Sequence, residues 1–249
     1  MDLVNIDDKV NFKYTENEES KIRQLETLYQ YSSEELDKYI NPYLMNDGIL
    51  KFKGYYNEET FRKRKYNEPT NNIKDIINSK IKLIDDYFKN HANKTEEEKI
   101  VYRGMETPYE NDTVIGNTNC IKSFTSTSSD KGEAWNYSNN GIFGVSEGNE
   151  CCIYEFKIAK GIPYIDMNDL GKYSSKYGDH KEILLPRNLS ITYTGTADYK
   201  VLGKPVKKMN VTYNIPSVDG KKKKRRSKRR SKKRSKRRSK KRSKKRIYY

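Results

Sequence analysis

The spacing of apolar residues changes near residue 99 of this chain, and that change limits the folds it can adopt. Before this point apolar residues recur every three or four positions, most clearly between Ile73 and Phe88, as along one face of a helix. Beyond it, short stretches alternate apolar and polar residues, as in 152–158, which is typical of strands. Because helices come first and strands follow, the order predicts an α+β fold.

Helices are predicted three times in the first 95 residues. The first covers 19–31, and residues 32–35 resemble a capping segment for the second, whose apolar residues end before Asn41 and Pro42. The third opens at residues 69–70 and carries the long apolar stripe.

Short strands are predicted after residue 99, with one helix among them. This helix covers 130–137 and follows Ser128, Ser129 and Asp130, which are residues that favour a helix start. The predicted strands cover residues 100–105, 124–127, 152–158, 162–165, 183–185, 199–202 and 206–213.

The segment 221–249 differs in composition from the rest of the chain. It holds 21 of the 51 Lys and Arg residues and none of the 34 Asp and Glu residues. Its repeating unit is three basic residues followed by a serine, so a serine recurs every four positions. The first 220 residues are therefore slightly acidic, and the net charge of +17 comes from this tail. With so few apolar residues, the tail cannot bury enough surface to offset its chain entropy, so it is predicted to be disordered.

This contrast predicts two regions with different functions. A folded domain is expected over 1–214, with its core at about 19–213, and a linker with the disordered tail is expected over 215–249. The positive charge predicts that residues 221–249 bind nucleic acid through its phosphates, with steep salt dependence. A nuclear localisation signal and a contact with an acidic surface are alternative interpretations of the same charge.

Several other functional classes find no support in the sequence. The three cysteines, two of them adjacent, do not form a disulfide framework and indicate a reducing compartment. The two histidines lie far apart, so no metal site is predicted. Because no signal peptide or transmembrane run is present, we expect an intracellular protein without a membrane partner, in the nucleus or in a virion.

Three short segments stand in a set order along the chain. They are Val101-Tyr102-Arg103-Gly104, then Phe124-Thr125-Ser126-Thr127-Ser128, then His180-Lys181-Glu182-Ile183-Leu184-Leu185-Pro186-Arg187. In this order and at these separations they resemble the arginine–serine–glutamate class of ADP-ribosyltransferases, which contains the bacterial ADP-ribosylating exotoxins. The resemblance covers about 19–213. It implies N-terminal helices followed by a mixed or antiparallel core of two β-sheets, with NAD as substrate and no metal.

The resemblance implies a role for one or more residues of each segment. Arg103 would grip the NAD phosphates, which suits its planar fork of donors, and Gly104 and Thr127 would line the same site. Ser126 would hold the pocket and orient Glu182. The Glu182 carboxylate, bonded to the ribose 2′-hydroxyl, would stabilise the positive charge that builds as nicotinamide leaves. Taken one at a time, these residues also fit ordinary polar positions at strand ends.

His180 departs from the family pattern, which has Glu or Gln two residues before the catalytic glutamate. A histidine is neutral or cationic near neutral pH and binds a guanidinium poorly, so arginine is not favoured as the acceptor. Asp179 lies beside His180, and Tyr177 lies in the segment that forms the target-recognition turn of the family. The resemblance implies that these three residues contact a protein acceptor. Ordinary loop positions are the alternative for His180 and Tyr177.

These residues lead to three functional hypotheses. The first is a mono-ADP-ribosyltransferase that moves ADP-ribose from NAD to a protein side chain, a pentosyl transfer, and is tethered to nucleic acid by its tail. Since His180 replaces the acceptor-binding residue, an NAD glycohydrolase is the second. The tail motivates a third hypothesis, a nucleic-acid packaging protein with an inactive ADP-ribosyltransferase-like body.

Overall fold

The computed structural model describes residues 15–33, 35–50, 56–64, 72–105, 114–139, 152–174, 181–201 and 203–213. Within these residues helices come first along the chain and strands follow, which confirms the predicted α+β class. The helices are α1 (Glu16–Ser33), α2 (Asp37–Met45), α3 (Glu58–Lys63), α4 (Ile73–Asn90), α5 (Lys131–Asn139) and the 3-10 helix η1 (Met167–Tyr173).

Helix α4 owes its position to its apolar stripe and to its first turn. Ile77 and Ile84 on this stripe are fully buried. The side chain of Asn72 accepts a hydrogen bond of 3.0 Å from the backbone of Lys74 and caps the helix. The helix therefore begins at Ile73, a few residues after the predicted start at 69–70.

The junction between α1 and α2 differs from its prediction. Ser32 and Ser33, expected in a capping segment, lie in the last turn of α1, and Leu36 precedes α2 without a side-chain cap. Helix α2 also continues through Pro42, where a stop was predicted. A proline inside a helix costs about 3 kcal/mol, whereas burial of one large apolar side chain contributes roughly 1.5–3 kcal/mol. Helix α2 buries three such side chains, which offset its proline: Tyr39, Ile40 and Tyr43.

Helix α3 has no counterpart among the predicted helices. It is only six residues long, and a reciprocal cap starts it, in which the backbone of Thr60 donates to the Asn57 side chain at 3.0 Å. Its buried Phe61 packs edge to face against Tyr39, with 4.9 Å between the ring centroids. One buried side chain in one helical turn leaves no periodicity that the sequence could reveal.

The strands are short, apart from the last two. They are β1 (Asn93–Lys94), β2 (Lys99–Met105), β3 (Thr118–Ile121), β4 (Thr125–Ser128), β5 (Cys152–Ile158), β6 (Pro163–Asp166), β7 (Glu182–Leu185), β8 (Leu189–Val201) and β9 (Lys204–Tyr213). Strand β8 begins at Leu189, far before the predicted start at residue 199. In the first part of the strand, buried residues alternate with exposed or half-buried polar residues, and the buried ones are Leu189, Ile191 and Tyr193.

The strands form one hydrogen-bonded run in the order β1-β6-β7-β4-β2-β5-β9-β8-β3. The run is mixed, because β5 and β9 are parallel while the other pairs are antiparallel. Two groups, β1-β6-β7-β4 and β2-β5-β9-β8-β3, meet at a single register pair of Tyr102 with Ser128. The two sheets implied by the resemblance correspond to these groups, which are joined at that pair.

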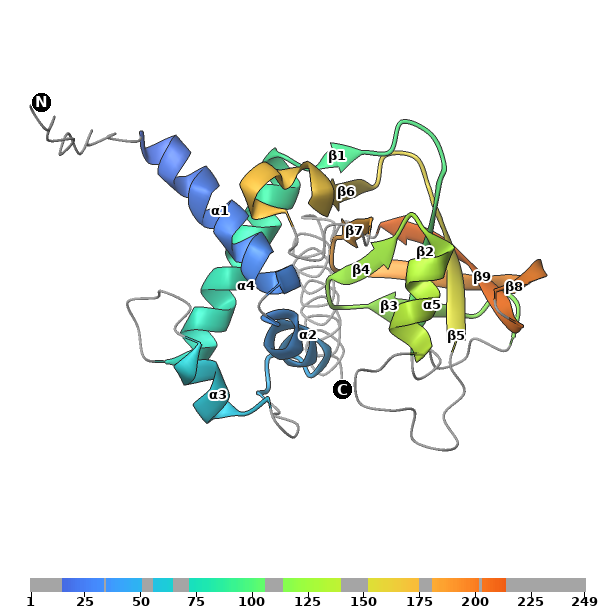
Figure 1. Ribbon diagram of the computed structural model, residues 1–249, viewed down its shortest axis with the longest axis horizontal. Coiled ribbons are helices and arrows are strands. Elements are labelled where there is room, and N and C mark those ends of the chain that lie inside the picture. Colours follow the sequence, from blue (N-terminus) through green and yellow to red (C-terminus); the bar gives the residue numbers. More distant parts are fainter. Residues whose placement is uncertain are drawn as a thin grey trace, which may run out of the picture. The chain divides into compact units, whose positions relative to one another are not determined.

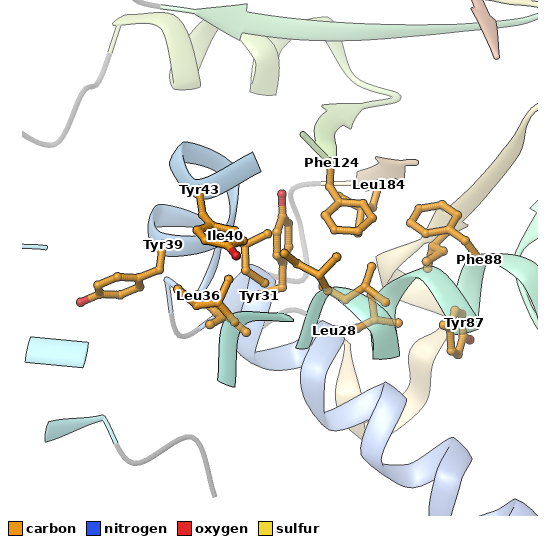
Figure 2. Packing of buried hydrophobic residues seen from close by; sticks show 14 of the residues in the cluster. Leu28, Tyr31, Leu36, Tyr39, Ile40, Tyr43, Tyr87, Phe88, Phe124 and Leu184 are labelled. Carbon is orange, nitrogen blue, oxygen red and sulfur yellow. The ribbon is translucent and has the colours of Figure 1, made fainter. Parts of the chain in front are cut away.

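The helical part of the fold packs against the β6-β7-β4 side of this run. Figure 1 shows α1–α4, in blue to teal, gathered beside the strands. The cluster between them contains apolar residues of the helices together with Phe124, Ile165 and Leu184 from the strand region, and Figure 2 shows Tyr31, Phe124 and Leu184 within it. Phe124 meets Tyr31 edge to face and stacks on Phe88, each at 5.9 Å between ring centroids. The end of α1 is thereby held next to strand β4.

Candidate active site

Arg103, Ser126 and Glu182 lie on three strands that neighbour one another, in the order β7-β4-β2. Glu182, the first residue of β7, pairs with Ser128 at the end of β4. Ser128 in turn pairs with Tyr102, the neighbour of Arg103 on β2. The fold thus gathers at one place in the sheet three residues that are far apart in the sequence.

Within the described residues, Arg103 donates a hydrogen bond through one nitrogen, while a second nitrogen has no partner. Its Nη1 donates to the backbone carbonyl of Ser126 at 2.6 Å. Its Nε is buried and makes no hydrogen bond to any residue that the structure describes. A buried donor without a partner costs about 1–3 kcal/mol, so an acceptor from a bound ligand would stabilise this site.

Glu182 is half-buried at the start of β7, and a residue of helix α1 binds it. The Ser32 hydroxyl donates to Oε2 of Glu182 at 2.5 Å, across 150 residues of sequence. Sequence reasoning missed this partner, because Ser32 was interpreted as part of a cap for the next helix. No local pattern could have revealed it, since the bond depends on where α1 packs against the sheet.

Tyr31, the residue before Ser32 on α1, lies near enough to Arg103 and Glu182 for their charges to affect it. It is almost fully buried, and its hydroxyl exchanges hydrogen bonds with the Asn41 side chain, at 2.9 Å when the amide donates. Burial raises the pKa of Tyr31 above its ordinary value, and the nearby negative charges of Asp37 and Glu182 raise it further. The Asn41 hydrogen bond and the positive charge of Arg103 oppose this rise. Because its pKa is raised, the Tyr31 phenol is neutral near neutral pH, while Arg103 is positively charged and Glu182 negatively charged.

The hydroxyl residues of β4 differ in what they contact. Thr127 is buried, and its hydroxyl donates to the Ile183 carbonyl of the next strand at 2.7 Å, so it ties β4 to β7. Ser126 is half-buried, beside the Arg103 contact. Of the three residues that favour a helix start here, Asp130 caps α5 by accepting a hydrogen bond from the backbone of Gly132 at 2.7 Å.

Lys181, the residue directly before Glu182, has a strained backbone and is held by two contacts. Lys181 has a φ of 47°, in the left-handed region that non-glycine residues rarely adopt. Its Nζ contacts Asp130 at 3.0 Å, and its carbonyl accepts from the backbone of Ser129 at 3.1 Å. These contacts fix the start of β7 to the end of β4, and so they fix the position of Glu182.

The chain is similar to solved structures, although no protein-family model and no curated protein sequence matches it. The ATR domain of SpvB from Salmonella is 20% identical and matches 76% of this chain and 98% of its own, with a TM-score of 0.50. C3stau2 from S. aureus, solved with NAD, is 14% identical over 81% of this chain and 89% of its own, with a TM-score of 0.51. The catalytic domain of VahC from Aeromonas hydrophila is 16% identical over 76% and 98%, with a TM-score of 0.51.

These structures are catalytic domains of bacterial ADP-ribosyltransferase toxins. This chain has an ADP-ribosyltransferase fold. The match covers nearly the whole of each similar domain, so the fold implied by the three sequence segments is confirmed. At these identities the likeness concerns the fold, and the chemistry of the site must be argued from its own residues.

Three predicted site residues of this ADP-ribosyltransferase fold, Tyr177, Asp179 and His180, lie outside the described residues. Gly104 follows Arg103 on β2 and pairs with Ile153 of β5. In the described part of the chain no three His, Cys, Asp or Glu side chains are grouped to hold a metal ion. None of the described helices is long and apolar enough to cross a membrane.

Asp130→Asn tests the tether beside Glu182. The hydrogen bond from Lys181, followed by that from the Gly132 backbone, lowers the pKa of Asp130 below its ordinary 3.8. A lowered pKa in the folded state stabilises the fold above the ordinary value, and this stabilisation is lost as the pH falls through the folded value. Asparagine keeps the capping oxygen, and the pair is solvent-exposed, so we expect a loss of only about 0.5 kcal/mol near neutral pH.

The measurement is the free energy of unfolding in urea for both proteins across a range of pH. The difference should narrow as the pH drops below 3.8. A difference that stays constant over the whole range would mean that the charge of Asp130 does not stabilise the fold.

Proposed function

We propose that this protein is a mono-ADP-ribosyltransferase, which cleaves NAD between nicotinamide and ribose and transfers ADP-ribose to a protein side chain. The observation that carries the proposal is the meeting of Arg103, Ser126 and Glu182 on adjacent strands of an ADP-ribosyltransferase fold. A similar structure, C3stau2, was solved with NAD, which supports NAD as the substrate here.

The donor set at Arg103 fits the diphosphate of NAD. Its Nη1 is held by the Ser126 carbonyl at 2.6 Å, so the guanidinium is fixed to the strand, and its buried Nε has no acceptor among the residues that the structure describes. A phosphate oxygen would supply this acceptor and would balance the positive charge. Gly104 and Ser126 would form the rest of the NAD site with Thr127, which would support β4 through its bond to Ile183.

Glu182 would act on the ribose. As nicotinamide leaves, positive charge builds on the anomeric carbon, and a fixed carboxylate stabilises this charge more than it stabilises bound NAD. The bonding electrons of the carbon–nitrogen bond leave with nicotinamide, and a nucleophile of the acceptor takes its place on the same carbon. Ser126 would orient the glutamate from the neighbouring strand.

The acceptor would be a protein side chain other than arginine, contacted by Tyr177, Asp179 and His180. Because a histidine at position 180 favours no particular nucleophile, water is a competing acceptor, and NAD hydrolysis is the second candidate function. The two functions differ only in where the ADP-ribose goes.

The decisive experiment is incubation of the protein with NAD labelled in its ADP-ribose part, with and without a eukaryotic cell extract as the source of acceptors. Transferase activity would place label on protein, and mass spectrometry of the labelled peptides would identify the modified residue. Free ADP-ribose without labelled protein would assign NAD hydrolysis. Unchanged NAD in both incubations would overturn both candidate functions.

We also propose that residues 221–249 bind nucleic acid, because their 21 positive charges have no acidic residue among them. Affinity for a double-stranded DNA fragment should fall more than about 1000-fold between roughly 50 and 200 mM salt, since each neutralised phosphate releases a counterion. A chain ending at residue 214 should lose this binding and keep any activity on NAD. Equal DNA affinity of the two chains would contradict the proposal.

A further inference from the structure

We propose that Ser32, in the last turn of α1, is a positioning residue that holds the Glu182 carboxylate and keeps it ionised for the reaction. The inference rests on the proposed function and deepens it. It brings into the site a residue that belongs to none of the three sequence segments.

The contact itself has the geometry of a strong hydrogen bond. The Ser32 hydroxyl lies 2.5 Å from Oε2 of Glu182, which is typical of a hydroxyl that donates to an ionised carboxylate. Both side chains are only half-buried, so the bond sits at the surface of the protein core, where a substrate can reach the glutamate.

The position of Ser32 is fixed by its neighbours on the helix. Tyr31 beside it is buried, bonded to Asn41, and packed edge to face against Phe124 at 5.9 Å. Phe124 immediately precedes β4, the strand next to Glu182. The backbone of Leu36 donates to the Gln30 carbonyl at 3.2 Å and closes the end of α1. The Ser32 hydroxyl therefore lies on a rigid helix, which fixes its position relative to the Glu182 carboxylate.

The main chain around the glutamate is held as well. The backbone of Glu182 pairs with Ser128, and the residue before it, Lys181, is bonded to Asp130 and Ser129. These contacts fix the main chain of Glu182. Ser32, in the last turn of α1, supplies a donor to its carboxylate.

The expected consequence is both geometric and electrostatic. A hydroxyl that donates to the carboxylate stabilises its charged form and lowers the pH at which it takes up a proton. Within the described residues, the charged groups near Tyr31 or Glu182 include Arg103 on β2, Asp37 on α2, and the exposed Lys181–Asp130 pair. Replacing Ser32 leaves these groups in place. A change in the pH at which Glu182 takes up a proton would therefore result from loss of the Ser32 hydroxyl.

The test compares Ser32→Ala and Ser32→Thr with the unchanged full-length chain, and follows release of nicotinamide from NAD. Ser32→Ala should lower kcat by about tenfold or more and leave KM within about twofold, since the lost bond serves the reacting charge rather than NAD affinity. The acid limb of the pH profile of kcat should move to higher pH. Ser32→Thr keeps the hydroxyl and should restore most of the activity.

Thr27→Val is the matched control on the same helix. Thr27 is fully buried, and its hydroxyl donates to the Arg23 carbonyl at 2.8 Å within α1, with no bond to Glu182. This variant removes a hydroxyl and perturbs the helix, so it should lower thermal stability and leave the acid limb where it is. Equal kcat losses in Thr27→Val and Ser32→Ala would overturn the positioning role and assign Ser32 to helix stability alone.

A second measurement does not depend on activity. The side-chain carboxyl carbon of Glu182, followed by NMR in ¹³C-labelled protein, should titrate at higher pH in Ser32→Ala than in the unchanged chain. An identical titration in the two proteins would overturn the inference even if NAD is cleaved. If the titration shifts but the protein does not cleave NAD, the hydrogen bond between Ser32 and Glu182 is confirmed, but its role in catalysis is wrong. That result would also count against the proposed function.

Discussion

Glu182→Gln is expected to abolish nicotinamide release almost completely, by roughly 1000-fold or more in kcat. Glutamine has nearly the same shape and accepts the hydrogen bond from Ser32, so the fold and the α1 contact should persist. It lacks the negative charge that stabilises the ribose as the carbon–nitrogen bond breaks. The loss should therefore appear in kcat, while the affinity for NAD measured by calorimetry changes little.

Glu98→Gln is the matched control for this variant. Glu98 is an exposed carboxylate just before β2, and it pairs with Lys157 of β5 at 2.8 Å rather than with Arg103, Ser126 or Glu182. It should leave nicotinamide release unchanged. If Glu182→Gln released nicotinamide as fast as the unchanged protein, the assignment of Glu182 as the catalytic carboxylate would be wrong.

Phe124→Ala is expected to destabilise the fold by about 3–5 kcal/mol. Phe124 is fully buried, meets Tyr31 edge to face and stacks on Phe88. Its truncation leaves a cavity at the place where α1 and α4 join the strands. The midpoint of thermal unfolding should fall by roughly 10 °C or more.

This variant also distinguishes a packing role from a role in the site. Phe156→Ala, a truncation in the separate apolar cluster of the sheet, should cost a similar free energy of unfolding. At a temperature where both variants are still folded, only Phe124→Ala should also slow nicotinamide release, because it loosens Tyr31 and with it Ser32. Equal activity of the two folded variants would mean that α1 does not need this contact to reach Glu182.

The residues of the candidate site were accessible to sequence reasoning to different degrees. Arg103, Ser126 and Glu182 each stand in a short segment whose order along the chain carries information, so their resemblance could be recognised before the fold was known. Ser32 and Tyr31 carry no such signal. They lie on an amphipathic helix among residues of the same types, and only the packing of that helix brings them to the glutamate.

The elements of the fold show the same division. The α4 stripe and the alternation in β5 were predicted because each pattern is local and several residues long. The stop at Pro42 was wrong, because burial of the residues around it outweighed the local preference of proline. Strand β8 begins far before its predicted start at residue 199, although Leu189, Ile191 and Tyr193 alternate with polar residues as strands do, and it pairs with β9 along most of its length.

The amino-acid sequence by itself determined the α+β order, the charge of the tail, and the three residues that resemble an ADP-ribosyltransferase site. These properties follow from the identity and spacing of neighbouring residues, which a chain carries before it folds. The tertiary structure alone decided that β7, β4 and β2 lie side by side, that Arg103 has a buried donor without an acceptor among the described residues, and that Ser32 binds Glu182. Such contacts join residues up to 150 positions apart, and their energy exists only once the apolar core has brought the helices and the strands together.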